Sequence, residues 1–264
     1  MSEGKLGKSK EWKKIVDSLG EEAAQELSDV IEEAMSQPPK IAVIGKAGVG
    51  KTTTINNLFS ADWTVGHVDT GTKDKQEASF EMLSGGRLCV VDLPGLGEDL
   101  EKDEIYKKMY QEVLPNVDVI LYIMQANARD LEEDQIILRD IVSPLLGSQE
   151  KRLVVGLNKV DQIWPGGWIQ TANYPSREQE KSIKIRTRDI SEKLSKVTAI
   201  STDQIVYFSA LKAYRLNQLG EALVIAANDL GWKLPIRPKS SFDDASSAVK
   251  AVVNALFPWT RSRR

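Results

Sequence analysis

Short apolar runs alternate with segments whose apolar residues recur every three or four positions. The apolar runs cover residues 40–44, 87–92, 117–124, 151–157 and 205–208, and each has the length of a single buried strand. Helical spacing occupies residues 101–113, 130–142, 176–198 and 214–229. Strands and helices that alternate in this way predict an α/β domain with a mostly parallel sheet and helices on both faces.

One strand of the sheet is expected to belong to a hairpin. Residues 78–83 and 87–92 are strand-like and flank a Ser-Gly-Gly turn at 84–86. The second of these runs ends at Asp92, the first residue of an Asp-Leu-Pro-Gly motif. The hairpin therefore brings an acidic residue and a nearby glycine to the end of a strand.

Both ends of the chain carry amphipathic stripes. The first runs through residues 10–36 and is stopped by Pro38-Pro39, and the second lies within 241–257, before a short basic tail. We expect three parts: an N-terminal helical extension (1–38), a central domain (39–232), and a C-terminal helix with its tail (233–264). The stripes either pack as stabilising helices or pair into a separate helical appendage.

Composition narrows the class of protein. The net charge of −3 over 264 residues argues against a general nucleic-acid-binding surface. Cys89 and His67 are the only residues of their types, so no intrachain disulfide, cysteine-based zinc site or Ser-His-Asp hydrolase is expected. We expect the thiol of Cys89 to be buried and inert. No signal-peptide core and no run near the ~20 apolar residues of a membrane span is found, which predicts a cytoplasmic protein.

A glycine-rich loop stands between the first apolar run and a helix-like segment at 53–59. Its sequence is Gly45-Lys46-Ala47-Gly48-Val49-Gly50-Lys51-Thr52. Glycines in a strand–loop–helix unit let backbone N–H groups and the positive end of the helix surround a phosphate. Lys51 is expected to reach the β- and γ-phosphates, and the Thr52 hydroxyl to bind Mg²⁺. A turn without a ligand is the alternative, although such a turn needs neither residue.

Three later motifs indicate which nucleotide is bound. Asp92 is placed to hold Mg²⁺ through water, and the N–H of Gly95 to meet the γ-phosphate. In Asn158-Lys159-Val160-Asp161, the carboxylate of Asp161 can accept hydrogen bonds from N1–H and the 2-amino group of guanine, a pair of donors that adenine lacks. Ser209-Ala210 follows the last apolar run and is expected to supply a backbone N–H for the guanine O6.

In this order, the four motifs resemble those of P-loop GTPases with the Ras-like fold, over roughly residues 40–230. Residues 92–96 and 209–219 look like the Era-like bacterial GTPases, particularly the YfjP type. The resemblance implies a six-stranded, mostly parallel sheet, and GTP or GDP bound with Mg²⁺. A degenerate member that neither binds nor hydrolyses nucleotide is the alternative. The implied nucleotide contacts are Gly45, Lys46, Ala47, Gly48, Val49, Gly50, Lys51, Thr52, Thr53, Asp92, Gly95, Asn158, Lys159, Asp161, Ser209 and Ala210.

A threonine that binds Mg²⁺ and the γ-phosphate is expected in the polar segment 61–77. The candidates are Thr64, Thr70 and Thr72. The segment Thr72-Lys73-Asp74 looks like the switch segments of Era-like proteins, so Thr72 is the first choice and Thr70 the second. The expected catalytic residues are Lys51, Thr72 and Gly95, and the expected Mg²⁺ ligands are Thr52, Thr72 and Asp92.

Two positions depart from familiar members of the family. Leu96 stands where Ras carries the glutamine that orients the attacking water, so hydrolysis by the chain alone is expected to be slow. The missing group must come from another loop, a second copy or an activating protein. Within the chain, Glu98 and Asp99 are candidates, although both are expected on a solvated face. Gly48 replaces the asparagine typical of potassium-activated relatives, so potassium dependence is not predicted.

The motifs predict the reaction but not its purpose. We expect a nucleotide-dependent molecular switch in which GTP orders residues 61–77 and 96–100 for a partner. The alternative is a self-assembling or membrane-associated GTPase resembling immunity-related or dynamin-like GTPases. Phe257, Trp259 and the terminal arginines favour a peripheral membrane contact by the tail, whereas two aspartates at the start of its helix disfavour one.

Guanine nucleotide is the expected ligand, and a homodimer or an activating protein is the expected partner. No nucleic acid is expected, because RNA binding in Era-like proteins needs an added domain and no basic module interleaved with aromatic residues is found. The loop 163–175 reads as irregular. Its Trp164 and Trp168 either pack against the domain or form a partner site.

Overall fold

The computed structural model divides the chain into two compact units, residues 1–38 and 39–264, and each is considered by itself. The structure describes residues 17–18, 20–23, 38–59, 75–81, 87–97, 99–147, 151–232 and 234. In the first unit these include short helical stretches on either side of Gly20, whose φ is +83°. The second unit contains the sheet and all of the site described below.

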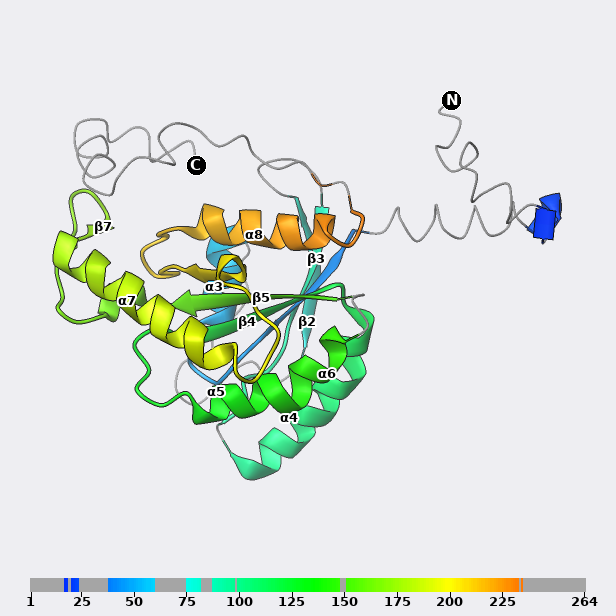
Figure 1. Cartoon of the computed structure of the whole chain (residues 1–264), viewed down its shortest axis with the longest axis horizontal. Coiled ribbons are helices and arrows are strands. Elements are labelled where there is room, and N and C mark those ends of the chain that lie inside the picture. Colours follow the sequence, from blue (N-terminus) through cyan, green and yellow to red (C-terminus); the bar gives the residue numbers. More distant parts are fainter. Residues whose placement is uncertain are drawn as a thin grey trace. The chain divides into compact units, whose positions relative to one another are not determined.

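A six-stranded sheet forms the core of the second unit (Figure 1). Its strand order is β2-β3-β1-β4-β5-β8, and every neighbouring pair is parallel except the antiparallel hairpin β2–β3. The strands are β1 (Lys40–Ile44), β2 (Gln76–Glu81), β3 (Arg87–Asp92), β4 (Val119–Gln125), β5 (Arg152–Asn158) and β8 (Ile205–Tyr207). The predicted α/β fold with a mostly parallel sheet is confirmed.

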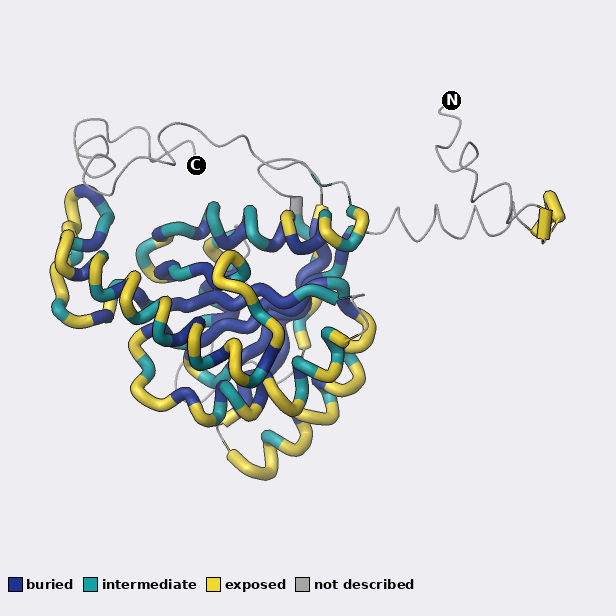
Figure 2. Tube along the Cα trace, viewed as in Figure 1, coloured by how far each residue is buried: buried dark blue, intermediate teal, exposed yellow. Residues whose placement is uncertain are grey.

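Helices cover both faces of this sheet, which buries its strands (Figure 2). They are α3 (Lys51–Phe59), α4 (Leu100–Val113), α5 (Glu132–Ile137), α6 (Ser143–Leu146), α7 (Arg177–Leu194) and α8 (Leu216–Asn228). α3 and α8 share a hydrophobic cluster with Ile41 and Val43 of β1. The other four helices pack in a second cluster with Ala42 and Ile44. Alternate residues of β1 enter different clusters because successive side chains of a strand point to opposite faces.

Local sequence explains where α4 begins and why the next helix is interrupted. Asp99 is the N-cap of α4, and its carboxylate accepts hydrogen bonds from the first helical N–H groups. This capping role engages Oδ1 of the carboxylate that was a candidate for positioning water. The predicted helix at 130–142 is not continuous, since α5 passes into a π-helical turn (η3, Leu138–Val142) before α6. Pro144, in the first turn of α6, has no N–H with which to continue the preceding helix.

The hairpin β2–β3 is displaced slightly from its prediction and contains the single cysteine. β2 begins at Gln76 rather than at residue 78, and it pairs along the whole length of β3. Cys89 is free and buried, and its thiol lies 3.4 Å from Oε1 of Glu77. Burial raises the pKa of the Cys89 thiol, and the nearby Glu77 carboxylate raises it further. The prediction of a buried, unreactive thiol agrees with these observations.

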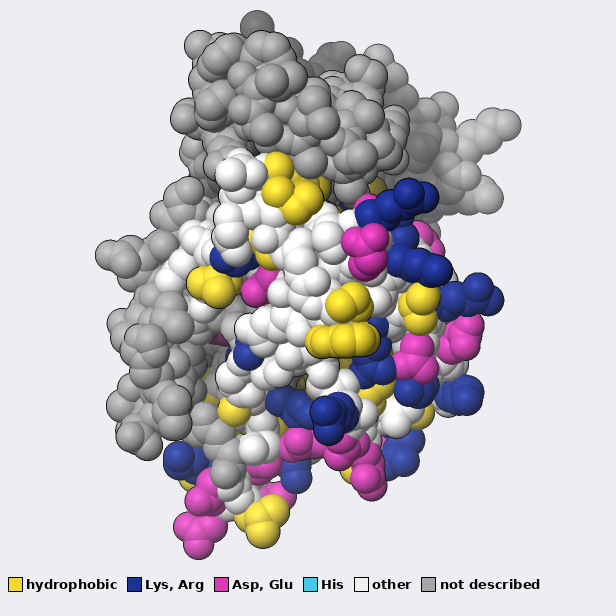
Figure 3. Space-filling model, turned by 90° about the vertical axis from the view of Figure 1, so that its left-hand side faces the viewer, with side chains coloured by type: hydrophobic (Ala, Val, Ile, Leu, Met, Phe, Trp, Pro, Cys, Tyr) yellow, Lys and Arg dark blue, Asp and Glu magenta, His cyan; other side chains and the backbone are white. Residues whose placement is uncertain are grey.

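The loop 163–175 is more regular than predicted. It contains a small antiparallel pair, β6 (Trp168–Ile169) and β7 (Tyr174–Pro175). The rings of Trp168 and Tyr174 meet Tyr214 edge-on, with centroids 5.1 and 5.5 Å from its ring. Trp168 therefore packs against the domain, whereas Trp164 is 85% exposed. On this side of the molecule, exposed hydrophobic side chains are scattered among charged ones (Figure 3).

Several predictions fall on residues outside the described ranges. They concern most of the stripe at 10–36, the threonines Thr64, Thr70 and Thr72, the turn at 84–86, Glu98, and the C-terminal stripe and tail. Among the described residues, no helix combines the length and the apolar character needed to cross a membrane.

Candidate functional site

The glycine-rich loop joins β1 to α3 in a conformation that requires glycine. φ is +141° at Gly45, +70° at Gly48 and +95° at Gly50. A Cβ on Gly45 would lie 2.1 Å from the carbonyl oxygen of Ile123, and a Cβ on Gly50 would lie 2.5 Å from Nδ2 of Asn158. The glycines therefore allow the loop to approach the ends of β4 and β5 closely.

Lys51 is the first residue of α3 and is almost buried, with 7% of its surface exposed. Its ammonium donates hydrogen bonds to the carbonyl oxygens of Gly45 at 3.3 Å and Lys46 at 3.2 Å. The positive charge thus lies over the loop, beside the N–H groups that begin the helix. A cation next to a helix N-terminus favours binding of an anion such as phosphate.

Thr52 and Asp92 form the acidic side of the site. The Thr52 hydroxyl donates to Oδ2 of Asp92 at 2.6 Å, while Oδ1 of Asp92 is buried without a hydrogen-bond partner among the described residues. Hydroxyl and carboxylate oxygens suit Mg²⁺, and an unpaired buried oxygen fits a ligand role. The described ranges contain no group of three or more His, Cys, Asp or Glu side chains placed to hold a metal ion, and a Mg²⁺ ion shared with phosphates needs only one or two carboxylates.

Burial raises the pKa of Asp92 from its ordinary value of 3.8 to about 6, although the hydrogen bond from Thr52 and the charge of Lys51 oppose the rise. The folded protein therefore holds this proton more tightly than the unfolded chain does. The contribution of Asp92 to stability is then largest below pH 3.8 and is lost as the pH rises to about 6.

Replacing Asp92 with asparagine is expected to stabilise the nucleotide-free protein at pH 7 without Mg²⁺. The buried charge costs about 3 kcal/mol at that pH, and the neutral amide avoids most of this cost. Denaturant unfolding of both proteins measures the difference. It should shrink toward pH 4, where the Asp92 carboxyl is protonated. Asp118→Asn, at the opposite end of the sheet, is the control, and equal stabilities of the Asp92 variant and the wild type at pH 7 would contradict the prediction.

The segment after Asp92 lies directly on the glycine-rich loop. The N–H of Ala47 donates to the carbonyl oxygen of Leu96 at 2.8 Å. A Cβ on Gly95 would lie 2.6 Å from the backbone nitrogen of Ala47 and 2.8 Å from Nζ of Lys51. Leu96 is 2% exposed and belongs to the hydrophobic core, so its side chain is not available to orient a water molecule.

The Asn-Lys-Val-Asp motif connects the glycine-rich loop to the loop after β8. Nδ2 of Asn158 donates to the carbonyl oxygen of Val49 at 2.8 Å. Oδ1 of Asn158 accepts from the N–H groups of Lys159 at 2.8 Å and Ala210 at 2.9 Å. Lys159 has a φ of +64°, and its ammonium donates to the carbonyl oxygen of Gly48 at 2.7 Å. Three chain segments thus meet at one edge of the sheet.

Asp161 presents an unused acceptor at this edge. It lies in a 3-10 turn (η4, Val160–Gln162), and its Oδ1 is buried without a hydrogen-bond partner in the part of the chain that the structure describes. The predicted donor to the guanine O6 is engaged instead, since the N–H of Ala210 is bound to Asn158 and that of Ser209 to the Tyr214 carbonyl at 3.1 Å. A base would have to share or displace one of these bonds.

The structure brings Gly45 to Thr53, Asp92, Gly95, Asn158, Lys159, Asp161, Ser209 and Ala210 to the carboxyl ends of β1, β3, β5 and β8. A family model described as 50S ribosome-binding GTPase matches residues 40–159, which include most of these positions. This part of the chain is similar to the P-loop GTPases. The Ser209-Ala210 segment and Asp161 lie beyond the matched residues.

Curated proteins are similar to the chain over part of their length. The chain is 26% identical to the uncharacterized protein YkfA of Escherichia coli, over 62% of this chain and 57% of the relative. It is 30% identical to the uncharacterized protein YfjP of the same organism, over 55% and 48%. It is 25% identical to GTPase Era of Aquifex aeolicus, over 70% and 55%. The chain thus spans about half the length of these relatives.

Solved structures share the Ras-like fold of this chain. An Aquifex aeolicus Era variant bound to GDP and AlF4⁻ has a TM-score of 0.52 at 23% identity, over 75% of this chain and 57% of that one. Toc33 of Arabidopsis thaliana with Mg²⁺ and GMPPNP has a TM-score of 0.54 at 17% identity, over 76% and 89%. An Era complex with MgGDPNP and part of 16S ribosomal RNA scores 0.54 at 23% identity, over 83% and 66%. The expectation of no nucleic-acid partner is therefore not supported.

Lys46, in the glycine-rich loop, directs its side chain toward α5. Its ammonium pairs with the carboxylate of Asp134 on α5 at 3.0 Å, and only 1% of the Asp134 side chain is exposed. The Tyr122 hydroxyl donates to the same carboxylate at 2.8 Å. The backbone of Lys46 is therefore the part that remains at the loop for a phosphate contact.

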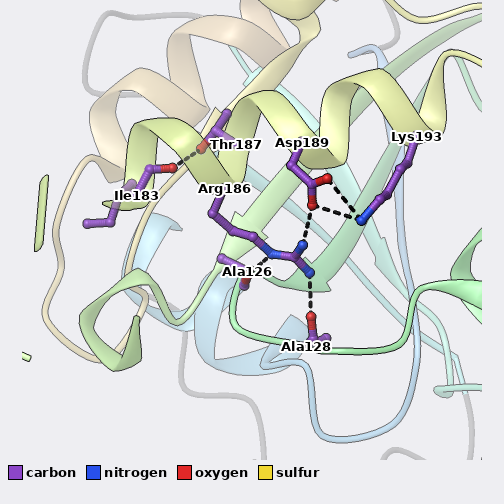
Figure 4. A network of polar contacts seen from close by, with 7 residues as sticks. All are labelled: Ala126, Ala128, Ile183, Arg186, Thr187, Asp189 and Lys193. Carbon is purple, nitrogen blue, oxygen red and sulfur yellow. Dashed lines mark hydrogen bonds and ion pairs between the residues drawn. The ribbon is translucent and has the colours of Figure 1, made fainter. Parts of the chain in front are cut away.

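Arg186 of α7 fixes the loop that follows β4 (Figure 4). Its guanidinium donates to the carbonyl oxygens of Ala126, at 3.0 Å, and Ala128, and it pairs with Asp189 on its own helix. The N–H of Ala126 donates in turn to the carbonyl oxygen of Asn158 at 2.8 Å. Arg186 thus supports the strand end that carries the Asn-Lys-Val-Asp motif.

Asp134 and Arg186 lie outside every motif recognised in the sequence. For Asp134 one local signal exists, because it shares helical spacing with Leu131 and Leu138 and so falls on the buried face of α5. For Arg186 no comparable signal exists, since α7 carries charged residues along most of its length. Thr72, the predicted switch residue, lies outside the described residues.

Proposed function

We propose that this chain binds GTP and GDP with Mg²⁺ and hydrolyses GTP to GDP and phosphate, as a nucleotide-dependent molecular switch. The observation that carries the proposal is the junction between the glycine-rich loop and the Asn-Lys-Val-Asp motif. There Lys159 donates to the carbonyl oxygen of Gly48 at 2.7 Å, and Oδ1 of Asp161 is buried without a partner among the described residues. A phosphate-binding loop beside an unused carboxylate fits a nucleotide that reaches both.

The glycine-rich loop supplies the phosphate contacts in this proposal. Backbone N–H groups from Gly45 to Thr53 surround the phosphates, and the Lys51 ammonium neutralises charge on the β- and γ-phosphates. Thr52, Asp92 and Thr72 hold Mg²⁺, which supplies further neutralisation of the phosphate charge when bound. The N–H of Gly95 meets the γ-phosphate, so the segment that lies on the loop responds to the phosphate state.

Asp161 supplies the choice of base. Its two carboxylate oxygens accept from N1–H and the 2-amino group of guanine, whereas adenine presents an unprotonated N1 and no 2-amino group. Lys159 and Asn158 hold this motif against the glycine-rich loop through the bonds to Gly48 and Val49. Rejection of adenine follows because Asp161 would be left buried without a donor.

Hydrolysis by the chain alone is slow in this proposal. Leu96 is buried in the core, and the carboxylate of Asp99 caps α4, so neither side chain orients water. A second copy or an activating protein then supplies the missing group. The alternative of a self-assembling or membrane-associated GTPase depends on the terminal stripes, most of whose residues lie outside the described ranges, and the comparisons do not favour it.

The first experiment measures GTP turnover per molecule over a wide range of protein concentration, with ATP as the control nucleotide. A specific rate that climbs with concentration indicates that a second copy supplies the missing group. A low rate that stays constant indicates a separate activator. Equal turnover of ATP and GTP would overturn the assignment of Asp161 as the residue that selects the base.

The comparisons add ribosomal RNA to the partners worth testing. The matching family is described as ribosome-binding, and one Era structure contains part of 16S ribosomal RNA. Addition of this RNA to the GTP turnover assay tests directly whether RNA is a partner of this chain. A rise that an unrelated RNA of equal length does not produce supports RNA as an activator, and equal rates with both RNAs reject it.

A further inference from the structure

The turn that carries Asp161 is held by one buried side chain from another element. Gln179 lies in the first turn of α7 and is 0% exposed. Its Nε2 donates to the carbonyl oxygens of Asp161 and Ile163, both at 3.0 Å. The turn is closed locally by two bonds, from the N–H of Gln162 to the carbonyl oxygen of Lys159 at 3.0 Å and from the N–H of Ile163 to that of Val160 at 3.2 Å. Gln179 therefore links the backbone beneath the Asp161 carboxylate to a long helix.

Chemistry determines how the Gln179 amide is oriented. Only the NH₂ group of a glutamine can donate to two carbonyl oxygens, so Oε1 points away from the turn. Oε1 is buried and has no hydrogen-bond partner within the described residues. An unpaired buried oxygen costs stability, and an apolar side chain of similar size avoids that cost. Stability alone does not explain a glutamine here, whereas the two bonds to the turn do.

The start of α7 is itself anchored, which makes Gln179 a rigid support. The N–H of Gln179 donates to Oγ of Ser176 at 3.2 Å, and the N–H of Ser176 donates to the carbonyl oxygen of Gly167 at 2.7 Å. Gly167 has a φ of +147°, and a Cβ there would lie 2.5 Å from Oγ of Ser176. The hairpin β6–β7 and the first turn of α7 therefore form one packed unit (Figure 1).

The same unit contacts the loop after β8, the second segment proposed to read the base. Nδ2 of Asn173 donates to the carbonyl oxygen of Lys212 at 2.7 Å. Trp168 and Tyr174 pack against Tyr214, which forms backbone bonds with Ser209. Both base-reading segments are thus supported by residues inserted between β5 and α7 and by the first turn of that helix.

We propose that Gln179 is a positioning residue that orients the Asp161 carboxylate toward N1–H and the 2-amino group of guanine, and so contributes to base specificity. This inference rests on the proposed function. Two hydrogen bonds to one edge of a base require the carboxylate to be held within about half an ångström, and the backbone of the turn determines where it lies. Neither bond of Gln179 involves the glycine-rich loop, so phosphate binding does not depend on it.

Gln179→Leu removes both bonds and fills the position with an apolar side chain of similar size. The Kd for GDP should rise about tenfold, since misplacement weakens the two hydrogen bonds to guanine. Inosine lacks the 2-amino group, so the ratio of the Kd for IDP to the Kd for GDP should fall toward one. The KM for GTP should rise while kcat changes by less than about twofold. A wild-type ratio in this variant would overturn the inference.

Gln204→Leu is the matched control, because Nε2 of Gln204 also donates to a backbone carbonyl oxygen, that of Leu153 in β5 at 3.1 Å, at the opposite end of the sheet. It should lower thermal stability without changing the IDP to GDP ratio, and an equal fall in both variants would overturn a specific role for Gln179. Gln179→Met keeps the length of the side chain and is expected to reproduce the fall. If Gln179→Leu does not fold, Gln179→Met takes its place in the measurement of the Kd values for IDP and GDP.

Asp161→Asn distinguishes failure of this inference from failure of the proposed function. If Gln179 acts through Asp161, adding Gln179→Leu to Asp161→Asn should raise the Kd for GDP by less than about twofold further. Fully additive effects would show that Gln179 acts elsewhere and would overturn the inference alone. An unchanged Kd for GDP in Asp161→Asn itself would overturn the proposed function, and the inference with it.

Discussion

Replacing Lys51 with alanine is expected to lower GTP turnover by at least about a thousandfold. The ammonium lies 3.3 Å from the carbonyl oxygen of Gly45 and 3.2 Å from that of Lys46, at the start of α3. Negative charge develops on the phosphate oxygens as the γ-phosphoryl group is transferred, and this ammonium is positioned to neutralise it. Phosphate release under single-turnover and steady-state conditions, with saturating Mg²⁺ and GTP, measures the loss.

Lys151 offers a matched control for Lys51. Its ammonium also donates to two backbone carbonyl oxygens, those of Pro115 at 2.6 Å and Val117 at 2.7 Å. It precedes β5 and so lies at the end of the sheet opposite the site. Lys151→Ala should lose some stability and keep turnover within about twofold of the wild type. A folded Lys51→Ala protein with nearly normal turnover would contradict the role proposed for this residue.

Replacing Asp161 with asparagine is expected to weaken GDP binding by at least about a hundredfold and to create binding of xanthosine diphosphate. The asparagine oxygen still accepts from N1–H of guanine, whereas the NH₂ that replaces the other oxygen faces the 2-amino group, so one hydrogen bond is lost and two donors are brought together. Xanthine carries a carbonyl oxygen in place of the 2-amino group, and this oxygen accepts from the new amide. Competition of both nucleotides against fluorescent GDP measures the exchange of preference.

Asp203→Asn provides the control for this exchange, because Asp203 is exposed and precedes β8 at the opposite end of the sheet. Its substitution removes one negative charge without touching the site. The control should bind GDP as the wild type does and should gain no affinity for xanthosine diphosphate. If Asp161→Asn also keeps its preference for GDP, another residue reads the base.

The order of the strands and helices could be predicted because it depends on residues close together in the sequence. β4 is an unbroken apolar run, a pattern typical of a strand covered on both faces. α4 begins directly after the capping residue Asp99. The hairpin β6–β7 escaped prediction because its two-residue strands pack against Tyr214, which belongs to a distant part of the chain.

The grouping of the main residues of the candidate site at one edge of the sheet could be predicted for a related reason. The glycine-rich loop, Asp92 and Asp161 each follow an apolar run closely, and the carboxyl ends of parallel strands meet at one edge of a sheet. The absence of a water-orienting glutamine at Leu96 was also visible in the sequence. The contact between the Leu96 carbonyl and the Ala47 N–H was not, because it depends on how the segment after β3 folds back over the loop.

Local sequence was thus sufficient to predict the element order, to locate the glycine-rich loop and to reveal the resemblance to P-loop GTPases, since each is encoded within a few consecutive residues. Folding in three dimensions was needed to establish what supports those motifs. Lys46 turns toward Asp134, Arg186 holds the loop after β4, and Gln179 holds the turn of Asp161. No periodicity or motif relates the members of these pairs, and they come within bonding distance because α5 and α7 pack on one face of the sheet.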